Sequence, residues 1–385
     1  EENFLNMVEW IDEIKVRASM GKTGTQSIGD HMWRTLYSPV SYGDKNALIP
    51  TQLGNDKIKW ESTVQKDLGL DFSFMRGRLG GTFGYYHKVT DGTLLNMTPA
   101  PSSSYSTVVF NIAKIRNQGL EFDIHGDFIR KKDFRWTGSL NISRNVSKVL
   151  DINGGPFSDP NDRDALNLGT SVVKEGELGL LYGRVATGII KTQEQLEAAK
   201  EAFPRWSSSS PYLNLGDIAY VYEDNSWKQD VIGHATPDFF GGYTNTITWK
   251  RLTLTALFTF SYGNDLIYQK DVSDSGMSSL ANRGTRVLNH YSEDNTSSNR
   301  PRSMWGTTYM LSSLNVYDAS YFKLKTLSLS YNLPESICRK VRIKSASVYG
   351  TATNVFTITS YPGPDPEVSD DPTSVIGGGR DVSTY

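Results

Sequence analysis

Hydrophobic and polar residues alternate along a run of twenty-one residues, 242–262, which divides into two segments at a Lys-Arg pair. From Leu252 to Tyr262 every second residue is apolar, and threonine or serine fills the positions between them except at Leu257. This spacing has the period of a β-strand. The first segment alternates in the same way, and a two-residue turn would place Trp249 opposite Leu252. The run is therefore predicted to be a β-hairpin.

The length of these strands and the type of their polar residues favour a membrane barrel over a soluble sheet. Each segment has about ten residues, whereas soluble strands average roughly five to six and a tilted strand needs roughly 9 to 11 to cross a bilayer. The polar face carries threonine and serine in place of lysine and glutamate, which suits a wet, enclosed interior. We predict an all-β fold, an antiparallel transmembrane β-barrel.

The same alternation recurs along the chain and predicts nine strands. They are 14–20, 62–74, 79–89, 118–128, 134–146, 240–249, 252–262, 320–333 and 344–358. We expect eight apolar side chains on them to face lipid: Phe72, Phe83, Phe122, Trp136, Ile247, Leu254, Phe258 and Leu329. Bacterial barrels have even strand numbers, so the chain is predicted to supply nine to ten strands of a larger barrel.

The lengths of the connections predict how the barrel is oriented. Short turns are expected at 75–78, 129–133, 250–251 and 334–343, and long connections at 21–60, 90–117, 147–239 and 263–319. Outer-membrane barrels have short periplasmic turns and long extracellular loops. A capping-box pattern at Thr192 and Gln195 also predicts one surface helix within the third long connection, and a strand at 182–190 is assigned to the external loops or to an extra pair.

Composition and charge narrow the classes of protein. The chain has 385 residues and a formal net charge of −2, which argues against a nucleic-acid partner. It contains no run of eighteen apolar residues, so no transmembrane helix is predicted. Cys338 is the sole cysteine, which excludes an intrachain disulfide. The chain starts at Glu1 without an initiator methionine or signal peptide, and we interpret it as a piece of a longer protein.

Basic residues concentrate in the short turns. These turns, extended to Lys344, hold eleven basic and two acidic residues, which leaves 29 of the 40 basic and 40 of the 42 acidic residues elsewhere. We hypothesise that this basic rim attracts the head groups of outer-membrane lipid. The alternative is that the turns simply hold solvated charges.

Catalytic and cofactor motifs are absent from the sequence. The five histidines are scattered without metal-ligand spacing, and there is neither a Gly-x-Ser-x-Gly elbow nor a phosphate-binding glycine loop. His125, on the polar face of a strand, is interpreted as a solvated residue of the barrel interior. The protein is therefore predicted not to be an enzyme.

Seven short motifs occur in order across almost the whole chain. They are VRASMGKTG at 16–24, KWEST at 59–63, IRNQGLEF at 115–122, PDF at 237–239, SYGN at 261–264, YFKLKTLSLSY at 321–331 and NVFTIT at 354–359. Their order and spacing resemble the SusC/RagA-like TonB-dependent transporters of bacterial outer membranes. The resemblance implies that residues 1–385 are the C-terminal part of a 22-stranded plugged barrel, with the plug domain, the TonB-contacting region and the closing strand outside this chain.

The resemblance also implies a function and partners. It implies TonB-dependent import of a large nutrient, an oligosaccharide or a peptide, together with a SusD-like surface lipoprotein. A siderophore or cobalamin receptor of the same architecture, and a non-transport surface barrel or adhesin, remain alternatives. The family often has a cation-loop-like segment, but residues 216–226 lack the glycine that such a loop needs. No cofactor is therefore predicted, and calcium at that segment is left as the alternative.

Aromatic residues in the long loops are the candidate ligand-binding residues. Their flat rings stack on sugars and also hold peptides, so they do not choose between the two substrate classes. Packing of the loops themselves, or contact with the lipoprotein, would equally require aromatic residues. The candidates are Trp33, Tyr37, Tyr42, Trp206, Tyr212, Tyr220, Tyr222, Trp227, Trp305, Tyr309 and Tyr317.

Overall fold

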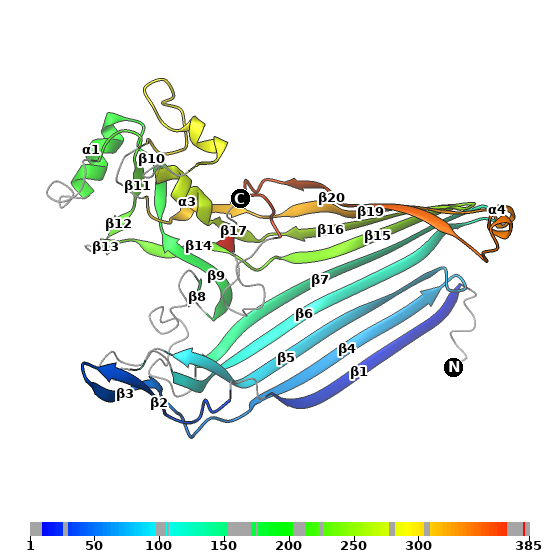
Figure 1. The fold of residues 1–385 in the computed structure, drawn as a ribbon, viewed down its shortest axis with the longest axis horizontal. Coiled ribbons are helices and arrows are strands. Elements are labelled where there is room, and N and C mark those ends of the chain that lie inside the picture. The colour runs from blue at the N-terminus through cyan, green and yellow to red at the C-terminus, as the bar shows by residue number, and fades with distance from the viewer. Residues whose placement is uncertain are drawn as a thin grey trace.

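Nine long antiparallel strands and three short ones form one curved sheet, and a lobe of shorter elements lies at one end of it (Figure 1). The computed structural model describes residues 10–25, 30–97, 105, 108–152, 171–174, 176–202, 213–223, 226–276, 282–303, 309–367 and 380–381. Neighbouring strands of the sheet are consecutive among the long strands of the chain, so it is an up-and-down wall. We call these nine strands the wall.

The wall contains all nine strands predicted from the sequence, in the predicted order. They are β1 (Ile11–Thr25), β4 (Glu61–Phe74), β5 (Leu79–Met97), β6 (Val108–Arg130), β7 (Phe134–Ile152), β15 (Phe239–Trp249), β16 (Leu252–Tyr262), β19 (Tyr321–Asn332) and β20 (Ser347–Thr359). The hairpin of β15 and β16 pairs Trp249 with Leu252, as predicted. The turn between them begins at Lys250, whose φ of 54° is left-handed.

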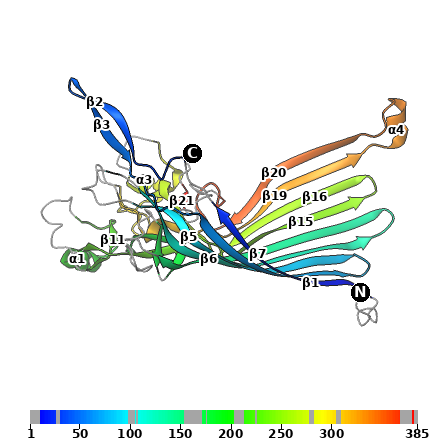
Figure 2. The ribbon, with the colours of Figure 1, turned by 90° about the horizontal axis from the view of Figure 1, so that it is seen from below.

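Two predicted connections were partly wrong because strands run on through them. The ladder of β5 and β6 continues to the pair of Met97 and Val108, so the connection is 98–107 and not 90–117. Register shifts between Asp91 and Leu94 break the alternation of side chains there while the backbone pairing continues. Likewise β1 includes 21–25, which pair with β4. Since 98–107 is shorter than the 333–346 connection, the lengths do not alternate strictly, although successive turns still lie at opposite ends (Figure 2).

The register of the wall separates an apolar face from a polar face. Ile247, Leu254 and Leu329 lie opposite one another on three adjacent strands, and Thr246 and Thr255 pair on the other face. Residues paired directly across strands point to the same side of a sheet. The ladders place all eight side chains expected to face lipid on this apolar face. Leu257, the exception to the alternation, is on the polar face, next to a register shift between β16 and β19.

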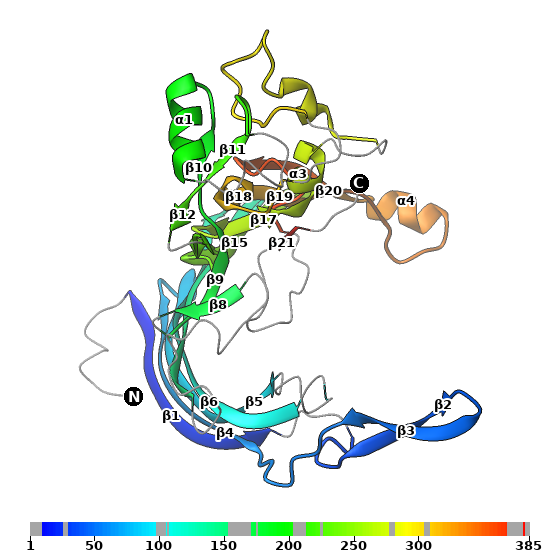
Figure 3. The same ribbon diagram turned by 90° about the vertical axis from the view of Figure 1, so that its left-hand side faces the viewer.

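The connections at the end of the wall opposite the short turns contain the remaining elements. A separate hairpin, β2 (Leu36–Tyr42) with β3 (Lys45–Gln52), projects away from the sheet (Figure 3). The 153–238 connection holds β8 (Ser171–Lys174), β9 (Glu177–Arg184), β10 (Ala186–Ile189), α1 (Gln193–Ala202), β11 (Ile218–Tyr220), β12 (Tyr222–Glu223), β13 (Ser226–Trp227) and β14 (Gln229–His234). The 263–320 connection holds β17 (Asp265–Tyr268), α3 (Gln269–Gly276), η4 (Thr285–Asn289), η5 (Ser313–Asn315) and β18 (Val316–Asp318), and β21 (Arg380–Asp381) pairs with β17.

The predicted surface helix is α1. The predicted strand at 182–190 is divided between β9, which extends the sheet through pairing with β7 and β14, and β10, which pairs with β11 outside it. The capping box forms as expected, because the Thr192 hydroxyl accepts from the Gln195 N–H and the Gln195 side chain accepts from the Thr192 N–H, both at 3.2 Å. A further helix, α4 (Glu335–Lys340), was not predicted and lies in the short turn between β19 and β20. None of the helices in the described residues is long and apolar enough to cross a membrane.

Candidate functional site

The two longest connections of the wall fold together into one lobe. We use this name for the described residues within 171–234 and 264–318. The Ser313 hydroxyl joins the two parts, since it accepts from the Ala186 N–H at 3.0 Å and donates to the Ala186 carbonyl at 3.1 Å. A buried apolar cluster also draws from both, with Ile189 and Ile218 packed with Tyr291 and Tyr309. The lobe therefore presents a surface that neither connection would form alone.

Asp217 is the centre of the first buried polar group in the lobe. Its carboxylate accepts from the Arg302 guanidinium at 2.6 and 3.2 Å, from the Tyr309 hydroxyl at 3.1 Å and from the Asn214 N–H at 2.8 Å. The hydrogen bond to Asp217 raises the pKa of Arg302. Burial, followed by the charge of Asp217, raises the pKa of Tyr309. These contacts join Asn214 and Asp217 to Arg302 and Tyr309 across the lobe.

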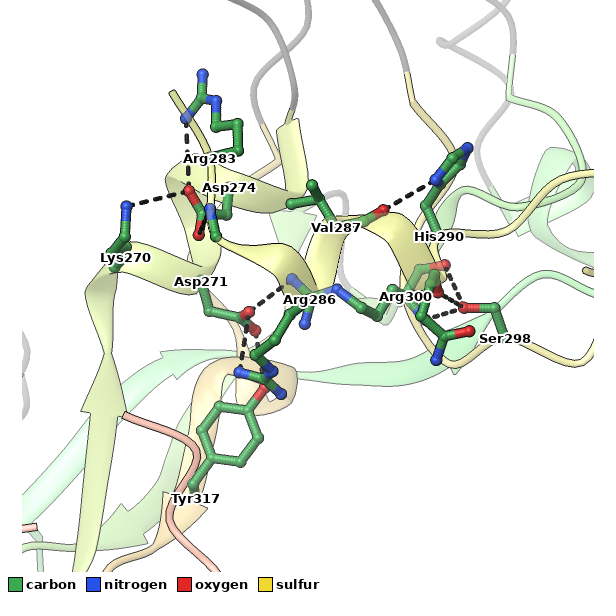
Figure 4. A network of polar contacts seen from close by, with 12 residues as sticks. Lys270, Asp271, Asp274, Arg283, Arg286, Val287, His290, Ser298, Arg300 and Tyr317 are labelled. Carbon is green, nitrogen blue, oxygen red and sulfur yellow. Dashed lines mark hydrogen bonds and ion pairs between the residues drawn. The ribbon is translucent and has the colours of Figure 1, made fainter. Parts of the chain in front are cut away.

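Asp271, on α3, is the centre of a second group (Figure 4). It accepts from the Arg300 guanidinium at 2.7 Å, the Arg286 guanidinium at 3.4 Å and the Tyr317 hydroxyl at 2.7 Å. Arg286 also lies over the Tyr317 ring, 5.5 Å from its centroid. Burial and the charge of Asp271 raise the pKa of Tyr317. Two arginines facing one carboxylate leave this part of the lobe with an excess of positive charge.

A pocket of about 560 Å³ opens beside the Asp271 group. Its lining is dominated by arginine, asparagine and serine, with Tyr317 and Ile218 among the few rings and apolar groups. Its principal polar residues are Arg286, Asn289, Ser297, Asn299 and Arg300. Such side chains form hydrogen bonds to polar ligands, and the volume is within the range of about 300 to 1,000 Å³ for small-molecule sites. The lobe thus contains a polar pocket suited to a hydrogen-bonding ligand.

The predicted aromatic residues separate into two regions. Trp33 precedes the β2–β3 hairpin, and Tyr37 and Tyr42 lie within β2. All three are exposed, Tyr42 at 80%. This hairpin is well apart from the lobe in both Figure 1 and Figure 3. These rings therefore form a surface distinct from the polar pocket.

The other candidates with described positions belong to the lobe, where several are committed to packing. Trp227 meets Tyr220 and Tyr222 edge to face at 5.3 and 5.9 Å between ring centroids. Burial raises the pKa of Tyr220 to about 12, and its hydroxyl bonds to the Met310 backbone. Tyr309 is only 7% exposed. Trp206, Tyr212 and Trp305 lie outside the described residues.

The sequence interpretation missed the charged residues that shape the pocket. Asp271 and Arg286 lie on short helices and Arg300 lies in a loop, all without hydrophobic periodicity, so the pattern that identified the wall gave no information about them. One usable signal was present. Four arginines occur within twenty residues, at 283, 286, 300 and 302.

The segment suspected of binding a cation has its first carboxylate in an ion pair. Asp217 faces Arg302, and 224–225 lie outside the described residues. Among the residues that the structure describes, no group of three or more His, Cys, Asp and Glu is placed to hold a metal ion. His125 is exposed on the polar face, 3.4 Å from Asp123. That the protein needs no cofactor stays a prediction.

The polar face of the wall carries ion pairs. Arg17 on β1 binds Asp71 on β4 at 2.7 Å. Near the lobe, Lys323 on β19 is 2% exposed and is bound by Asp365 at 2.9 Å and Glu367 at 2.8 Å. Charged residues held in pairs on this face are typical of a watery barrel interior, whereas the opposite face is apolar.

Comparison with known proteins identifies the family. Residues 6–355 match the family model described as TonB dependent receptor-like, beta-barrel. The chain is 33% identical over 380 residues to TonB-dependent receptor P3 of Formosa agariphila, and 27% identical over 392 residues to TonB-dependent receptor SusC of Bacteroides thetaiotaomicron. Each match covers 96% of this chain but only 37% and 36% of the relative.

Solved structures agree with the fold. The RagAB peptide transporter matches with a TM-score of 0.78 at 22% identity, over 98% of this chain and 40% of that one. A RagAB peptide importer in the closed-closed state gives 0.77 at 23% identity. The wall therefore has the fold of part of these transporters, whose chains are more than twice as long as this one. The chain belongs to the TonB-dependent receptor β-barrel family, is SusC-like, and lies in the bacterial outer membrane.

Proposed function

We propose that this chain forms part of the barrel of a TonB-dependent importer of a large polar nutrient, an oligosaccharide or a peptide. The single observation that carries the proposal is the lobe, in which two long connections fold around a polar pocket at the end of the wall opposite the short turns. A large ligand needs an extended surface outside the membrane before it can enter a barrel. The similarity to SusC supports the same conclusion at the level of the family.

The chemistry of the pocket supports a polar ligand over an apolar one. Asparagine and serine side chains with two arginines line the pocket, and they match the hydroxyl, amide and carboxylate groups of sugars and peptides. The exposed rings of Trp33, Tyr37 and Tyr42 add a stacking surface at some distance from it. Two separate contact regions fit a ligand that is longer than one sugar or one residue.

The proposal includes partners outside this chain. A SusD-like lipoprotein would cover the extracellular end and hold the ligand against the lobe. TonB would act through a region of the protein beyond these residues, together with the plug. The matched relatives are more than twice as long as this chain, which leaves room for both parts.

The test uses the full receptor in its native host. An affinity tag on the receptor should recover a surface lipoprotein from solubilised outer membranes, and deletion of the receptor should abolish growth on one class of oligosaccharide or on peptides as sole nutrient. Uptake should stop when TonB is deleted, since the import is driven through it. Unchanged uptake without TonB, or normal growth of the receptor deletion on every nutrient tested, would reject the proposal.

A matched pair of variants connects the pocket to the transport. Asn299→Ala removes a pocket amide, whereas Glu197→Ala removes an exposed carboxylate on α1. We expect weaker binding of the imported nutrient for the first and no change for the second, measured by calorimetry on the purified receptor–lipoprotein complex. Equal affinities in both variants would place the ligand elsewhere on the lobe.

A further inference from the structure

The turn between β19 and β20 exposes apolar and basic side chains together. It is the turn that contains α4, at the opposite end of the wall from the lobe (Figure 2). Its exposed apolar residues are Ile337, Val341 and Ile343, and Val341 is 62% exposed. Its exposed basic residues are Arg339, Lys340, Arg342 and Lys344. A surface turn usually exposes polar residues, whereas this turn exposes three apolar side chains next to four positively charged ones.

Backbone hydrogen bonds fix the conformation of this turn. Cys338 is buried beneath the helix and its carbonyl accepts from the N–H of Val341 at 3.2 Å and of Ile343 at 3.0 Å. Arg342 ends the helix in a left-handed conformation, with φ of 60°. Ile337 and Val341 are four residues apart and so share one side of the helical turn. The exposure of the apolar residues is therefore set by backbone hydrogen bonds.

The level of α4 relative to the membrane follows from the apolar face of the wall. At the short-turn end this face closes with a register row rich in aromatic residues: Phe134, Trp249, Leu252, Tyr331 and Val348. At the far end of the same strands the rings of Phe239 and Tyr262 stack at 5.2 Å. Ten residue steps of a strand tilted by about 40° span roughly 25 Å, the height of the apolar band in barrels of this kind. Since barrels have aromatic girdles at both membrane boundaries, α4 begins just past one of them, at the level of the head groups.

We propose that residues 335–344 bind anionic phospholipid of the inner leaflet of the outer membrane. Ile337, Val341 and Ile343 lie at the boundary of the acyl chains, and the four basic residues lie at the lipid phosphates. Charge complementarity selects this occupant, because the one acidic residue of the turn, Glu335, is already paired with Arg339 at 3.1 Å. The apolar residues of the turn also follow directly on the apolar face of β19 and β20, which favours lipid as the binding partner. The other short turns carry basic residues but no helix.

The test measures the depth of a nitroxide at Val341→Cys in the full-length receptor. The receptor is reconstituted in nanodiscs of phosphatidylcholine alone, or with about a third of phosphatidylglycerol, and collisions with oxygen and with a water-soluble nickel chelate are compared. We expect the label to gain oxygen contact and to lose nickel contact several-fold when phosphatidylglycerol is present. A label at Lys131→Cys, in the turn between β6 and β7, serves as the matched control and should stay aqueous in both membranes. Cys338 is 1% exposed and should not be labelled, and the wild-type receptor serves as its blank.

A variant without the four basic side chains separates the contribution of charge from that of the apolar residues. Replacing Arg339, Lys340, Arg342 and Lys344 by glutamine should abolish the effect of phosphatidylglycerol, because the charge attraction to the lipid is removed. Heat-modifiable mobility on a gel confirms that each variant has a folded barrel. A Val341 label that is aqueous in both membranes would overturn the proposal. A label shielded from both oxygen and nickel would also overturn it, because protein would then cover the turn. Equal depth of the label in the two membranes would overturn it as well.

Discussion

The wall and the lobe are built from the same chain but are ordered by different interactions. In the wall, β15 and β16 form eleven residue pairs in unbroken register, and every wall strand except β1 and β20 is paired with a neighbour on both sides. In the lobe, β12 and β13 share two pairs, and β10 and β11 share three with a register shift. The lobe has shorter backbone ladders than the wall, and buried side-chain contacts around Asp217 and Asp271 hold it together. Backbone repetition makes a wall that resists single changes, whereas the lobe depends on a few carboxylates.

This difference fits the different roles of the two regions, since the wall lies in the membrane and the lobe is proposed to bind the ligand. A barrel wall must satisfy every backbone group within the apolar layer, which only continuous ladders do. A surface that binds a ligand needs irregular backbone and polar side chains in particular places, and buried ion pairs provide these. The comparison therefore predicts which substitutions damage one region and spare the other.

The largest expected effect is that of Asp217→Ala in the lobe. The change leaves the Arg302 guanidinium and the Tyr309 hydroxyl without their shared acceptor, and the loss of one partner of a buried pair costs about 3 to 5 kcal/mol. Hydrogen exchange should show the lobe opening while the wall keeps its protection. Glu197→Ala, which breaks an exposed pair with Lys200, is the control and should change stability by less than about 0.5 kcal/mol. Equal exchange in the two variants would contradict the role of Asp217.

The next effect concerns the two faces of the wall. Leu254→Arg places a charge on the apolar face of β16, two residues from its turn end, and should cost about 2 kcal/mol, measured by urea unfolding in lipid. Thr255→Arg, one residue along, points to the polar face and should be tolerated. If both variants lost the same stability, the facing derived from the register would be wrong.

A smaller effect is expected where the chain after β20 returns to the wall. Burial opposes ionisation of Glu367, but hydrogen bonds from Lys323, Lys325 and Tyr321 outweigh it and lower the pKa of this carboxyl. Because the folded pKa lies below the usual value of about 4.3, the contact stabilises this segment at neutral pH and is lost only as the pH falls through the lowered pKa. Glu367→Gln should weaken it at neutral pH by about 1.5 kcal/mol.

Limited proteolysis of 361–367 against pH would check this contact. The wild-type segment should become sensitive only under acid conditions, and the Glu367→Gln segment should be cleaved faster already at pH 7. A matched control is Glu335→Gln, whose carboxylate is exposed at the other end of the wall. Cleavage at pH 7 that does not distinguish Glu367→Gln from wild type would argue against the contact.

The smallest effect on stability is expected at the β2–β3 hairpin. Alanine at Trp33, Tyr37 and Tyr42 removes exposed rings and should change the free energy of unfolding by less than about 0.5 kcal/mol. If these rings stack on the ligand, its affinity should nevertheless fall, each ring contributing about 0.5 to 1.5 kcal/mol. Calorimetry with the imported nutrient measures the loss. Unchanged affinity would mean that the ligand binds the lobe and does not contact the hairpin.

The wall was predictable from sequence because side-chain alternation is a direct consequence of strand geometry. Strand β16 begins and ends at the residues predicted, Leu252 and Tyr262. The prediction failed where backbone pairing continues without alternation, as at the shifts after Asp91, and where a short helix, α4, replaced a turn. A six-residue helix leaves no periodic signal that distinguishes it from a polar turn.

The lobe was predictable only in outline. Its aromatic residues were recognised as a group, but the sequence did not separate Tyr309, which is buried, from Tyr42, which is exposed. The pairing of Asp217 with Arg302 joins residues 85 positions apart, and no local pattern indicates it. Contacts that depend on how two loops meet require the fold itself.

The most direct test of the account is the side of the membrane on which each end of the wall lies. A cysteine at Lys200→Cys on α1 and another at Lys131→Cys in the turn between β6 and β7 can be exposed to a membrane-impermeant maleimide in intact cells. The account predicts that the first is labelled in intact cells and the second only after lysis. Labelling of the Lys131→Cys receptor in intact cells would mean that the short turns face the cell exterior. That result would contradict both the extracellular position of the lobe and the ligand pocket assigned to it.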